Sequence, residues 1–367
     1  MAIALNLLLV RAPEMAIILL LLFWWCVTPA LAVDNPFTSE KFGYIDRTGK
    51  LVIEDEYSSA NSFSEGIAFV GKGTKLAFID INGKKLFEYE EVSDVAAPPG
   101  RFCEGLSSRW TPNGTGFVDR TGQFAIQQKF SMATDFAQGL AAVADKDGKW
   151  GYIDRSGTFV IQPQFDACLE FSEGLAAVRV GSRWGFIERT GAFRIRPQYE
   201  FVDSFKEGLA PVYRHRTYSY IDVIGNVALE GPYYSASTFQ DGIAVVEPNS
   251  ISDAKSLRRY IDRTGKPLDL KTSQDESCGE GMLPFTKNGL VGFANIIGQE
   301  VIAPQYQATG GFSDGLAAVK LHGKWGYVNG SGQIVIPPTF DAAYPFSCGR
   351  ALVRLKESLP VTGPRLM

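Results

Sequence analysis

Short apolar runs separated by turns recur along nearly the whole chain. One run spans residues 174–180 (GLAAVRV), a second spans 183–188 (RWGFIE), and a third begins at Phe193. Side chains alternate between the two faces of a strand, so Trp184 and Phe186 share one face of the second run. Glycine and proline interrupt every run, and no window keeps a 3.6-residue period. The pattern therefore predicts strands rather than helices.

The same pattern returns with a period of about 34 residues, which marks a repeat array. Residues 149–165 read KWGYIDRSGTFVIQPQF, and residues 183–199 read RWGFIERTGAFRIRPQY. An aromatic ring marks the second run of every unit, at Tyr44, Phe78, Phe117, Tyr152, Phe186, Tyr220, Tyr260, Phe293 and Tyr327. A glycine keeps step with it, at Gly66, Gly105, Gly139, Gly174, Gly208, Gly242, Gly281, Gly315 and Gly349. In such arrays each unit buries its apolar face against its neighbours.

Each unit is predicted to fold as a three-stranded meander. Asp-x-x-Gly turns such as residues 154–157 join the second and third strands, and this composition suits a type I turn followed by a glycine bulge. A connection with proline and an aromatic residue, such as 162–165, leads to the next unit, and the proline is expected to end the strand. The recurring rings, among them Tyr152, Phe165 and Phe171, are expected to form the core between repeats.

These observations predict an all-β fold with about nine such repeats in residues 41–355 and a C-terminal tail at 356–367. Thirty-four residues are few for a propeller blade, which usually takes about 40 to 50. Nine blades also exceed the usual range of roughly 4 to 8. An open twisted β array is therefore favoured, and a closed propeller-like toroid is the alternative. Two insertions, around residues 88–100 and 247–257, are predicted to be surface loops on different faces.

The N-terminus differs from the repeats. Residues 15–32 carry no charge and end in Ala30-Leu31-Ala32, a pattern that resembles the cleavage site of a secretory signal peptide. The alternative is an uncleaved membrane anchor, since about 18 apolar residues can just span a bilayer. Met15 is an alternative start to Met1. Residues 1–32 thus predict an exported protein, periplasmic or extracellular, or one anchored in the membrane through this segment; residues 33–40 form a short leader.

The charge balance bears on the class of partner, and the cysteine positions bear on disulfide formation. The chain has 36 Lys and Arg against 40 Asp and Glu, a net charge of −4. Nucleic acid requires a concentrated basic surface, so we expect no nucleic-acid partner. The cysteines of the repeats fall in non-adjacent units, too far apart for a disulfide in an open array. We expect free and mostly buried thiols at Cys103, Cys168, Cys278 and Cys348.

The sequence offers no catalytic constellation. His215 and His322 lie in predicted loops without a recurring partner, and no Cys or His pair has metal-ligand spacing. The aspartates of the Asp-x-x-Gly segments are interpreted as turn formers. A second carboxylate series precedes the landmark glycines, at Glu65, Glu104, Glu173, Glu207 and Glu280, with substitutes at Gln138, Asp241, Asp314 and Cys348. We interpret it as a solvated turn; the alternative is a row that attracts a basic partner. We therefore predict that the protein is not an enzyme and that it has no catalytic, cofactor-binding or metal site.

Two blocks in fixed order identify a resemblance. Residues 149–157 (KWGYIDRSG) are followed by residues 171–178 (FSEGLAAV). The first block returns at residues 324–332 and the second at residues 312–319, so the two blocks alternate along the chain. This arrangement resembles the bacterial WG-repeat family. The resemblance implies tandem β repeats in bacterial proteins that are often exported, with no transferable catalytic residues. The Trp-Gly pair itself survives at Trp150, Trp184 and Trp325 and is replaced elsewhere.

Three functions compete at this stage. The favoured hypothesis is a non-catalytic binding or scaffold protein for a protein partner, because repeat arrays offer long surfaces. The alternative is a glycan or cell-wall binding protein that uses rings outside the regular packing pattern as ligand contacts, namely Trp110, Tyr233 and Tyr234. A hydrolase, suggested only by abundant carboxylates, is least favoured because it needs two opposed carboxylates in a cleft.

Overall fold

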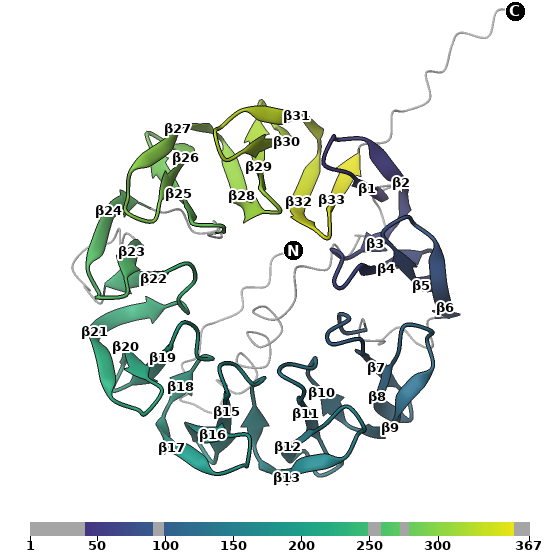
Figure 1. Ribbon diagram of the computed structural model, residues 1–367, viewed down its shortest axis with the longest axis vertical. Coiled ribbons are helices and arrows are strands. Elements are labelled where there is room, and N and C mark those ends of the chain that lie inside the picture. The colour runs from purple at the N-terminus through teal and green to yellow at the C-terminus, as the bar shows by residue number, and fades with distance from the viewer. Residues whose placement is uncertain (1–40, 91–98, 249–257, 272–278, 356–367) are drawn as a thin grey trace, which may run out of the picture.

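The computed structural model describes residues 41–90, 99–248, 258–271 and 279–355, and every regular element within these ranges is a β-strand. The strands form antiparallel sheets that radiate from a central axis and close into a ring (Figure 1). One seven-stranded sheet contains two successive repeats, so the ring has nine blades. The predictions of an all-β fold and of tandem repeats are confirmed.

We number the blades from the one that joins the chain ends and name the strands from the axis outward. Blades 1 to 5 contain β32 (Ala342–Ser347), β33 (Arg350–Leu355), β1 (Lys41–Ile45) and β2 (Leu51–Tyr57); β3 (Ser59–Ala60), β4 (Ile67–Lys72), β5 (Lys75–Asp80) and β6 (Lys85–Glu90); β7 (Ser107–Thr111), β8 (Gly114–Val118) and β9 (Phe124–Phe130); β10 (Met132–Ala133), β11 (Ala141–Ala144), β12 (Trp150–Ile153) and β13 (Phe159–Phe165); and β14 (Ala167–Cys168), β15 (Leu175–Val180), β16 (Arg183–Glu188) and β17 (Phe193–Tyr199).

Blades 6 to 9 follow in the same order. They contain β18 (Phe201–Val202), β19 (Leu209–Arg214), β20 (Thr217–Asp222) and β21 (Val227–Ala236); β21 again, β22 (Ile243–Pro248), β23 (Arg259–Asp262) and β24 (Pro267–Lys271); β25 (Met282–Lys287), β26 (Leu290–Asn295) and β27 (Glu300–Tyr306); and β28 (Ala308–Ser313), β29 (Leu316–Leu321), β30 (Lys324–Asn329) and β31 (Ile334–Phe340).

The favoured open array is wrong, and the closed toroid is the observed arrangement. Strand β1 pairs with β33 along five residues, from Lys41 opposite Leu355 to Ile45 opposite Ala351. The repeats begin in mid-blade, so the first repeat supplies the two outer strands of blade 1 and the last repeat supplies the two inner strands. Closure removes the two unpaired edges that an open array would leave.

The prediction of three strands per repeat also needs correction. In several blades a short fourth strand lies nearest the axis, as with Ala167–Cys168 of β14, which pairs with Val178 and Arg179. Nor does proline end the outer strand, because β13 continues through Pro163 to Phe165. A proline on an outer strand lacks only a donor that no neighbouring strand needs.

Glycine recurs in the Trp-Gly pair because the backbone of the neighbouring outer strand approaches it closely. Between Trp150 and Tyr152 the outer strand β13 bulges, since their partners Phe165 and Ile161 are four residues apart. A Cβ on Gly151 would lie 2.5 Å from the carbonyl oxygen of Ile161 and 2.8 Å from the nitrogen of Pro163. Glycine is therefore required where the bulged outer strand crosses the middle strand.

Each Asp-x-x-Gly turn packs on the preceding blade. A Cβ on Gly157 would lie 2.8 Å from the side chain of Ile126, and Gly49 meets Ile336 in the same way across the closure. The turns have the predicted chemistry, because Asp154 Oδ1 accepts hydrogen bonds from the backbone N–H groups of Ser156 and Thr158. The glycines recur because a side chain would push neighbouring blades apart.

The recurring rings form the core between blades, as predicted. Tyr152 is fully buried beside Phe165 and Phe171. Its hydroxyl donates a hydrogen bond to the carbonyl of Leu169 at 2.8 Å. Tyr44, Tyr220 and Tyr327 make the same bond to a carbonyl 17 residues later in the chain.

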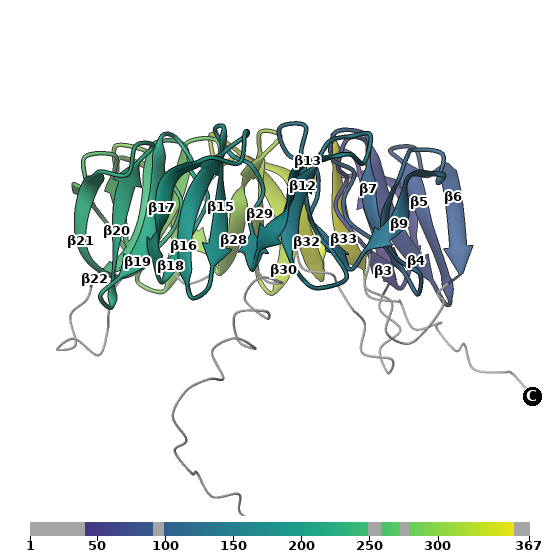
Figure 2. The ribbon, with the colours of Figure 1, turned by 90° about the horizontal axis from the view of Figure 1, so that it is seen from below.

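The two faces of the ring are built differently. Both the Glu-Gly turns and the Asp-x-x-Gly turns lie on one face, which we call the turn face. The hairpins between the two long inner strands, such as residues 181–182, lie on the opposite face, which we call the hairpin face. The strands run from one face to the other (Figure 2). Lys41 and Leu355, the ends of the described chain, both lie at the hairpin face because β1 begins there and β33 ends there.

Candidate functional site

The second carboxylate series forms a chain of contacts around the axis. Both residues of each Glu-Gly turn have positive φ, as with Glu173 at 53° and Gly174 at 81°. This conformation directs the side chain toward the next blade. The Glu173 carboxylate accepts hydrogen bonds from the backbone N–H groups of Glu207 and Gly208, at 2.6 and 2.8 Å. The expected solvated turn is therefore a joint between blades.

The same joint recurs in every blade but one. The acceptor side chains bond the glycine N–H of the following blade, in the pairs Glu65 to Gly105, Glu104 to Gly139, Gln138 to Gly174, Glu173 to Gly208, Glu207 to Gly242, Asp241 to Gly281, Glu280 to Gly315 and Asp314 to Gly349. Cys348 occupies the ninth acceptor position, at the closure before Gly66. A thiol is a weak acceptor, so the chain of carboxylate and amide contacts is interrupted there.

Arginines of the Asp-x-x-Gly turns strengthen these joints. Arg263 donates a hydrogen bond to the carbonyl of Glu207 at 2.7 Å, and Arg120 pairs with the Glu65 carboxylate at 3.1 Å. Each arginine belongs to the blade after the turn that it contacts. The sequence signal was present, since an acidic residue and an arginine recur with one period, but only the ring brings them together.

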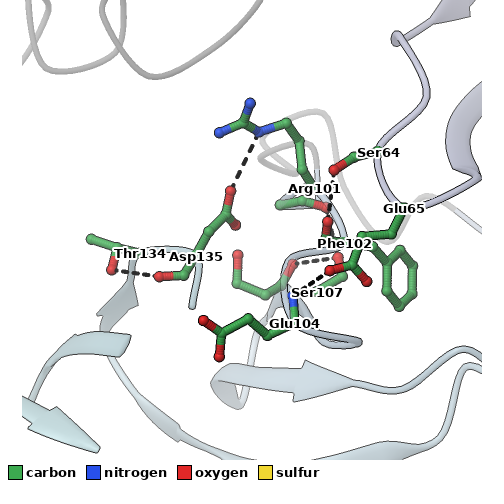
Figure 3. A network of polar contacts seen from close by, with 10 residues as sticks. Ser64, Glu65, Arg101, Phe102, Glu104, Ser107, Thr134 and Asp135 are labelled. Atoms are coloured by element: carbon green, nitrogen blue, oxygen red, sulfur yellow. Dashed lines mark hydrogen bonds and ion pairs between the residues drawn. The ribbon is translucent and has the colours of Figure 1, made fainter. Parts of the chain in front are cut away.

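A cluster of ionisable groups lies between the inner loops of blades 3, 4 and 5, and Figure 3 shows two of its members, Arg101 and Asp135. The side chain of Asp135 is 10% exposed, and its Oδ2 lies 3.5 Å from the Nε of Arg101. Burial raises the pKa of Asp135 despite this arginine. Burial, and then the Asp135 charge, raise the pKa of Glu170. Cys103 lies in the same cluster, and burial raises its pKa to about 12. Arg101, Asp135 and Glu170 stand four residues before the landmark glycine in three successive repeats, and sequence reasoning missed the cluster because the residue type at this position changes from repeat to repeat.

Two blades at this cluster lack a contact that recurs elsewhere. In four blades of the described structure a serine hydroxyl donates to the carbonyl of the next blade's buried phenylalanine, as Ser172 does to Phe205 and Ser347 does to Phe63. Cys103 and Ala137 stand at the serine position in blades 3 and 4, and blades 6 to 8 also lack the serine. In the cluster, the Glu170 carboxylate accepts the backbone N–H of Asp135, although its Oε1 is buried without a partner in the described structure. The cluster can hold charge or a proton near the axis.

The predicted ligand contacts are not brought together. Trp110 is 38% exposed at the end of β7 in blade 3. Tyr233 and Tyr234 lie in β21, between blades 6 and 7. Tyr233 packs against the buried core with Tyr220, whereas Tyr234 is 67% exposed. Of the three rings, Tyr234 is the most available to a ligand.

The cysteines and histidines lie apart from one another. Cys168 is buried as expected, but Cys348 is exposed because its turn lies at the ring surface; both are free thiols. Cys278 lies outside the described residues. His215 and His322 occupy hairpin turns with positive φ. Among the residues that the structure describes, no three His, Cys, Asp or Glu side chains gather in a group that could hold a metal ion.

The membrane and insertion predictions concern undescribed parts of the chain. Residues 1–40 and 356–367 are not described, nor are 91–98 and 249–257, which contain most of the two insertions. In the described ranges, no helix is long and apolar enough to cross a membrane. Strands β6 and β22, which lead into the insertions, both run away from the turn face. Both strands therefore end at the hairpin face; the insertions themselves lie outside the described residues, so their emergence on different faces stays a prediction.

The comparison with family models gives one match. A model described as "WG containing repeat" matches residues 42–75, 116–150, 150–184, 184–214, 292–325 and 325–357, which together exceed half of the chain. No curated protein matches.

Solved structures resemble the chain in fold. One titled as a eukaryotic initiation factor is 11% identical, with a TM-score of 0.52, and the match covers 81% of this chain and 95% of that one. BamB from Moraxella catarrhalis is 11% identical, with a TM-score of 0.43 and coverage of 80% and 95%. Hsv2p from Kluyveromyces lactis is 9% identical, with a TM-score of 0.38 and coverage of 74% and 96%. At these identities the likeness concerns the β-propeller-like fold alone.

Proposed function

The chain belongs to the WG-repeat family, and we propose that it is an exported, non-catalytic module that binds a protein partner through its hairpin face. The observation that carries this proposal is the difference between the two faces. The turn face repeats two short turns; the carboxylates of the Glu-Gly turns are engaged in joints between blades, and those of the Asp-x-x-Gly turns in hydrogen bonds within the turn. The strands that lead into the two insertions, β6 and β22, end at the hairpin face, as do both ends of the described chain, and departures from a repeat commonly mark the binding face.

The position of β22 supports this choice of face. The strand begins after the turn at Asp241 and Gly242 and ends at Pro248, where the insertion at 249–257 begins. The corresponding hairpin of blade 8 needs only Asn288 and Gly289. The extra residues are therefore not required to connect the strands, which leaves them free for another role.

Cross-linking tests this function. The full chain, with its own N-terminal segment and a C-terminal tag, is cross-linked in its host and compared with a variant in which residues 249–257 are replaced by Asn-Gly. We expect recovery of a protein partner with the native chain and its loss with the loop variant. The exposed substitution Ile297→Ser on the turn face is the control and should retain the partner. Recovery of no protein at micromolar concentration would contradict the proposal.

Export rests on residues 1–32 and has its own test. We propose cleavage after Ala32, which would leave Val33 as the first residue of the exported chain. The intact mass of protein recovered outside the cytoplasm distinguishes the outcomes. A chain that retains residues 15–32 and stays with the membrane fraction would favour the anchor instead.

Binding of a glycan is the alternative function, favoured by one observation. Tyr234 exposes 67% of its surface on the rim of the ring, and exposed rings of this kind can stack on sugars. Polysaccharide binding that is lost in Tyr234→Ala and kept in Trp110→Ala would support this alternative. Absence of binding to cell-wall polysaccharides would exclude it.

A further inference from the structure

The hairpin of blade 6 presents three consecutive basic side chains at the hairpin face. Strands β19 and β20 stand side by side in this blade (Figure 1), and His215 and Arg216 form the turn between them. The preceding residue, Arg214, is the last of β19. All three side chains are exposed. We call residues 214–216 the basic hairpin.

The backbone of this turn does not explain its residues. His215 and Arg216 both have positive φ, at 51° and 70°. The two-residue turns of blades 8 and 9 have the same conformation, but their second residue is glycine, Gly289 or Gly323. Glycine adopts positive φ without steric cost, whereas arginine does not. Residues held in such conformations often serve a function, so Arg216 is a candidate for one.

In other hairpins of this face a carboxylate of the same blade neutralises the cation. Blades 4, 5 and 9 have a lysine or arginine just after the hairpin turn and an acidic residue 17 positions later, with nitrogen-to-oxygen distances of 2.6 to 3.0 Å. These pairs are Lys149 with Asp166, Arg183 with Glu200, and Lys324 with Asp341. In blade 6 the same two positions hold Thr217 and Tyr234. The cations of blade 6 therefore stand without the acidic residue of this pattern.

Neither arginine of the basic hairpin pairs with a carboxylate in the described structure. Arg214 donates a hydrogen bond to the side-chain oxygen of Gln198 at 3.2 Å, and this amide carries no charge. Glu200 of the neighbouring blade is engaged by Arg183. The positive charge of the basic hairpin is thus not compensated locally, and such a patch attracts an anionic partner.

Two tyrosines lie on either side of the basic hairpin in the chain. Tyr213 and Tyr218 are cross-strand partners, and their ring centroids lie 4.9 Å apart. Phe201 packs on the second ring at 6.5 Å. Both tyrosines are half-buried, so they are held in place and still reach the surface. Arginine and tyrosine are enriched among the residues that dominate protein interfaces, which favours a protein segment over a small anion.

We propose that the basic hairpin, with Tyr213 and Tyr218, binds an acidic segment of the protein partner. Aspartate or glutamate carboxylates of that segment pair with Arg214 and Arg216, and arginine suits this role because its planar group can donate two parallel hydrogen bonds to a carboxylate. The inference rests on the proposed function, since it assigns a position and a chemistry to binding at the hairpin face. Because the contact is ionic and exposed, raising the salt concentration weakens it.

Binding of a fluorescein-labelled peptide of about ten glutamates to the full chain tests this site by fluorescence anisotropy. We expect a Kd between about 1 µM and 1 mM, and at least about tenfold weaker binding by Arg214→Gln/Arg216→Gly. Arg216→Gly alone gives the turn its favoured residue, so it should weaken binding while thermal stability stays equal or rises. A purely structural role for Arg216 would not separate these two measurements.

Lys149→Gln is the matched control, because it removes a hairpin-face cation whose charge Asp166 already neutralises. It should bind the peptide like the native chain. No peptide binding by the native chain, or equal binding by the native chain and the double variant, would overturn the proposal. An equal loss in the control would do the same. Tighter binding of labelled polygalacturonate that the double variant loses would replace the acidic protein segment by an anionic polysaccharide.

Cross-linking in the host separates this inference from the proposed function. We expect Arg214→Gln/Arg216→Gly to recover less of the protein partner than the native chain does. If the double variant recovers as much, binding of a protein stands and the role of the basic hairpin falls. If the native chain recovers no protein, the proposed function fails, and the glutamate peptide still decides whether this hairpin takes acidic segments.

Discussion

Among the residues that the structure describes, thirteen other than glycine adopt positive φ, and nine of them precede the landmark glycines. A left-handed conformation costs an ordinary residue roughly 1–2 kcal/mol. It persists here because it directs each side chain at the backbone N–H of the next blade. Hydrogen bonds to charged groups contribute about 1.5–3 kcal/mol and offset this cost. The acidic series is therefore a structural device, although its sequence pattern alone is equally compatible with a binding row.

The interruption of this series at Cys348 gives a first prediction. Cys348→Asp should supply the missing acceptor for the Gly66 N–H, as Asp314 does for Gly349. We expect about 1 kcal/mol of stabilisation, measured by thermal unfolding. The matched control Cys348→Ala supplies no acceptor. A gain of equal size in the control would show that the effect comes from removing the thiol.

The buried carboxylates near the axis give a second prediction, on pH. Burial raises the pKa of Glu170 in the folded state. A raised carboxyl pKa stabilises the fold below the ordinary value, and this stability is lost as pH rises through the folded-state pKa. Glu170→Gln should therefore stabilise the protein at neutral pH, with a difference that shrinks as pH falls. Thermal unfolding from pH 4 to 8 measures it. The exposed Glu230→Gln should show no such trend, and a trend of equal size there would contradict the assignment.

At the scale of elements, the Trp-Gly pair reflects the contact between the middle strand and the outer strand of a blade. The tryptophan position faces neighbouring side chains, whereas the glycine admits the bulge of the outer strand. Where the glycine is absent, the structure finds another solution. Opposite Ala77 the register shift of the outer strand lies one step further along, between Phe78 and Ile79, and Ser219 faces a strand with glycine at 231, whose Cβ position lies close to the carbonyl of Tyr218.

Gly151→Ala tests this account. The added Cβ would overlap the backbone of Ile161 and Pro163, so the outer strand would have to shift. Forcing extra atoms into packed structure typically costs 1–3 kcal/mol, so we expect a loss of about 3 kcal/mol in chemical denaturation. Gly330→Ala is the control, because a Cβ there meets nothing within 4 Å. Equal losses at both positions would implicate the general effect of replacing glycine on backbone freedom rather than this close approach.

At the scale of the whole molecule, closure joins residues nearly three hundred positions apart. Besides the pairing of β1 with β33, Arg350 donates to the carbonyl of Ile81 at 2.9 Å. Ser347 donates to the carbonyl of Phe63 at 2.7 Å. The Ser347 contact continues the blade-to-blade pattern across the chain ends, whereas Arg350 makes a contact specific to this closure, where Cys348 interrupts the carboxylate series.

Truncation tests how much this closure contributes to the stability of the ring. A chain that ends at Gly349 lacks β33 and leaves the inner edge of β1 without a partner. We expect a markedly lower unfolding temperature and a broader transition, because blade 1 loses its inner half. A chain that ends at Leu355 keeps β33 and is the control. If the two truncated chains unfold alike, the ring does not depend on its closing strand.

The sequence by itself determined the repeat length, the strand character, the Asp-x-x-Gly turns and the family, because these depend on neighbours within one unit of about 34 residues. Only the tertiary structure decided that the ring closes, that the acidic residues bond the next blade, and that Arg101, Asp135 and Glu170 meet near the axis. Each of these depends on the small rotation between blades, which accumulates over nine units. No single repeat encodes that rotation in its pattern, so the contacts between Lys41 and Leu355 could not be derived from period and composition.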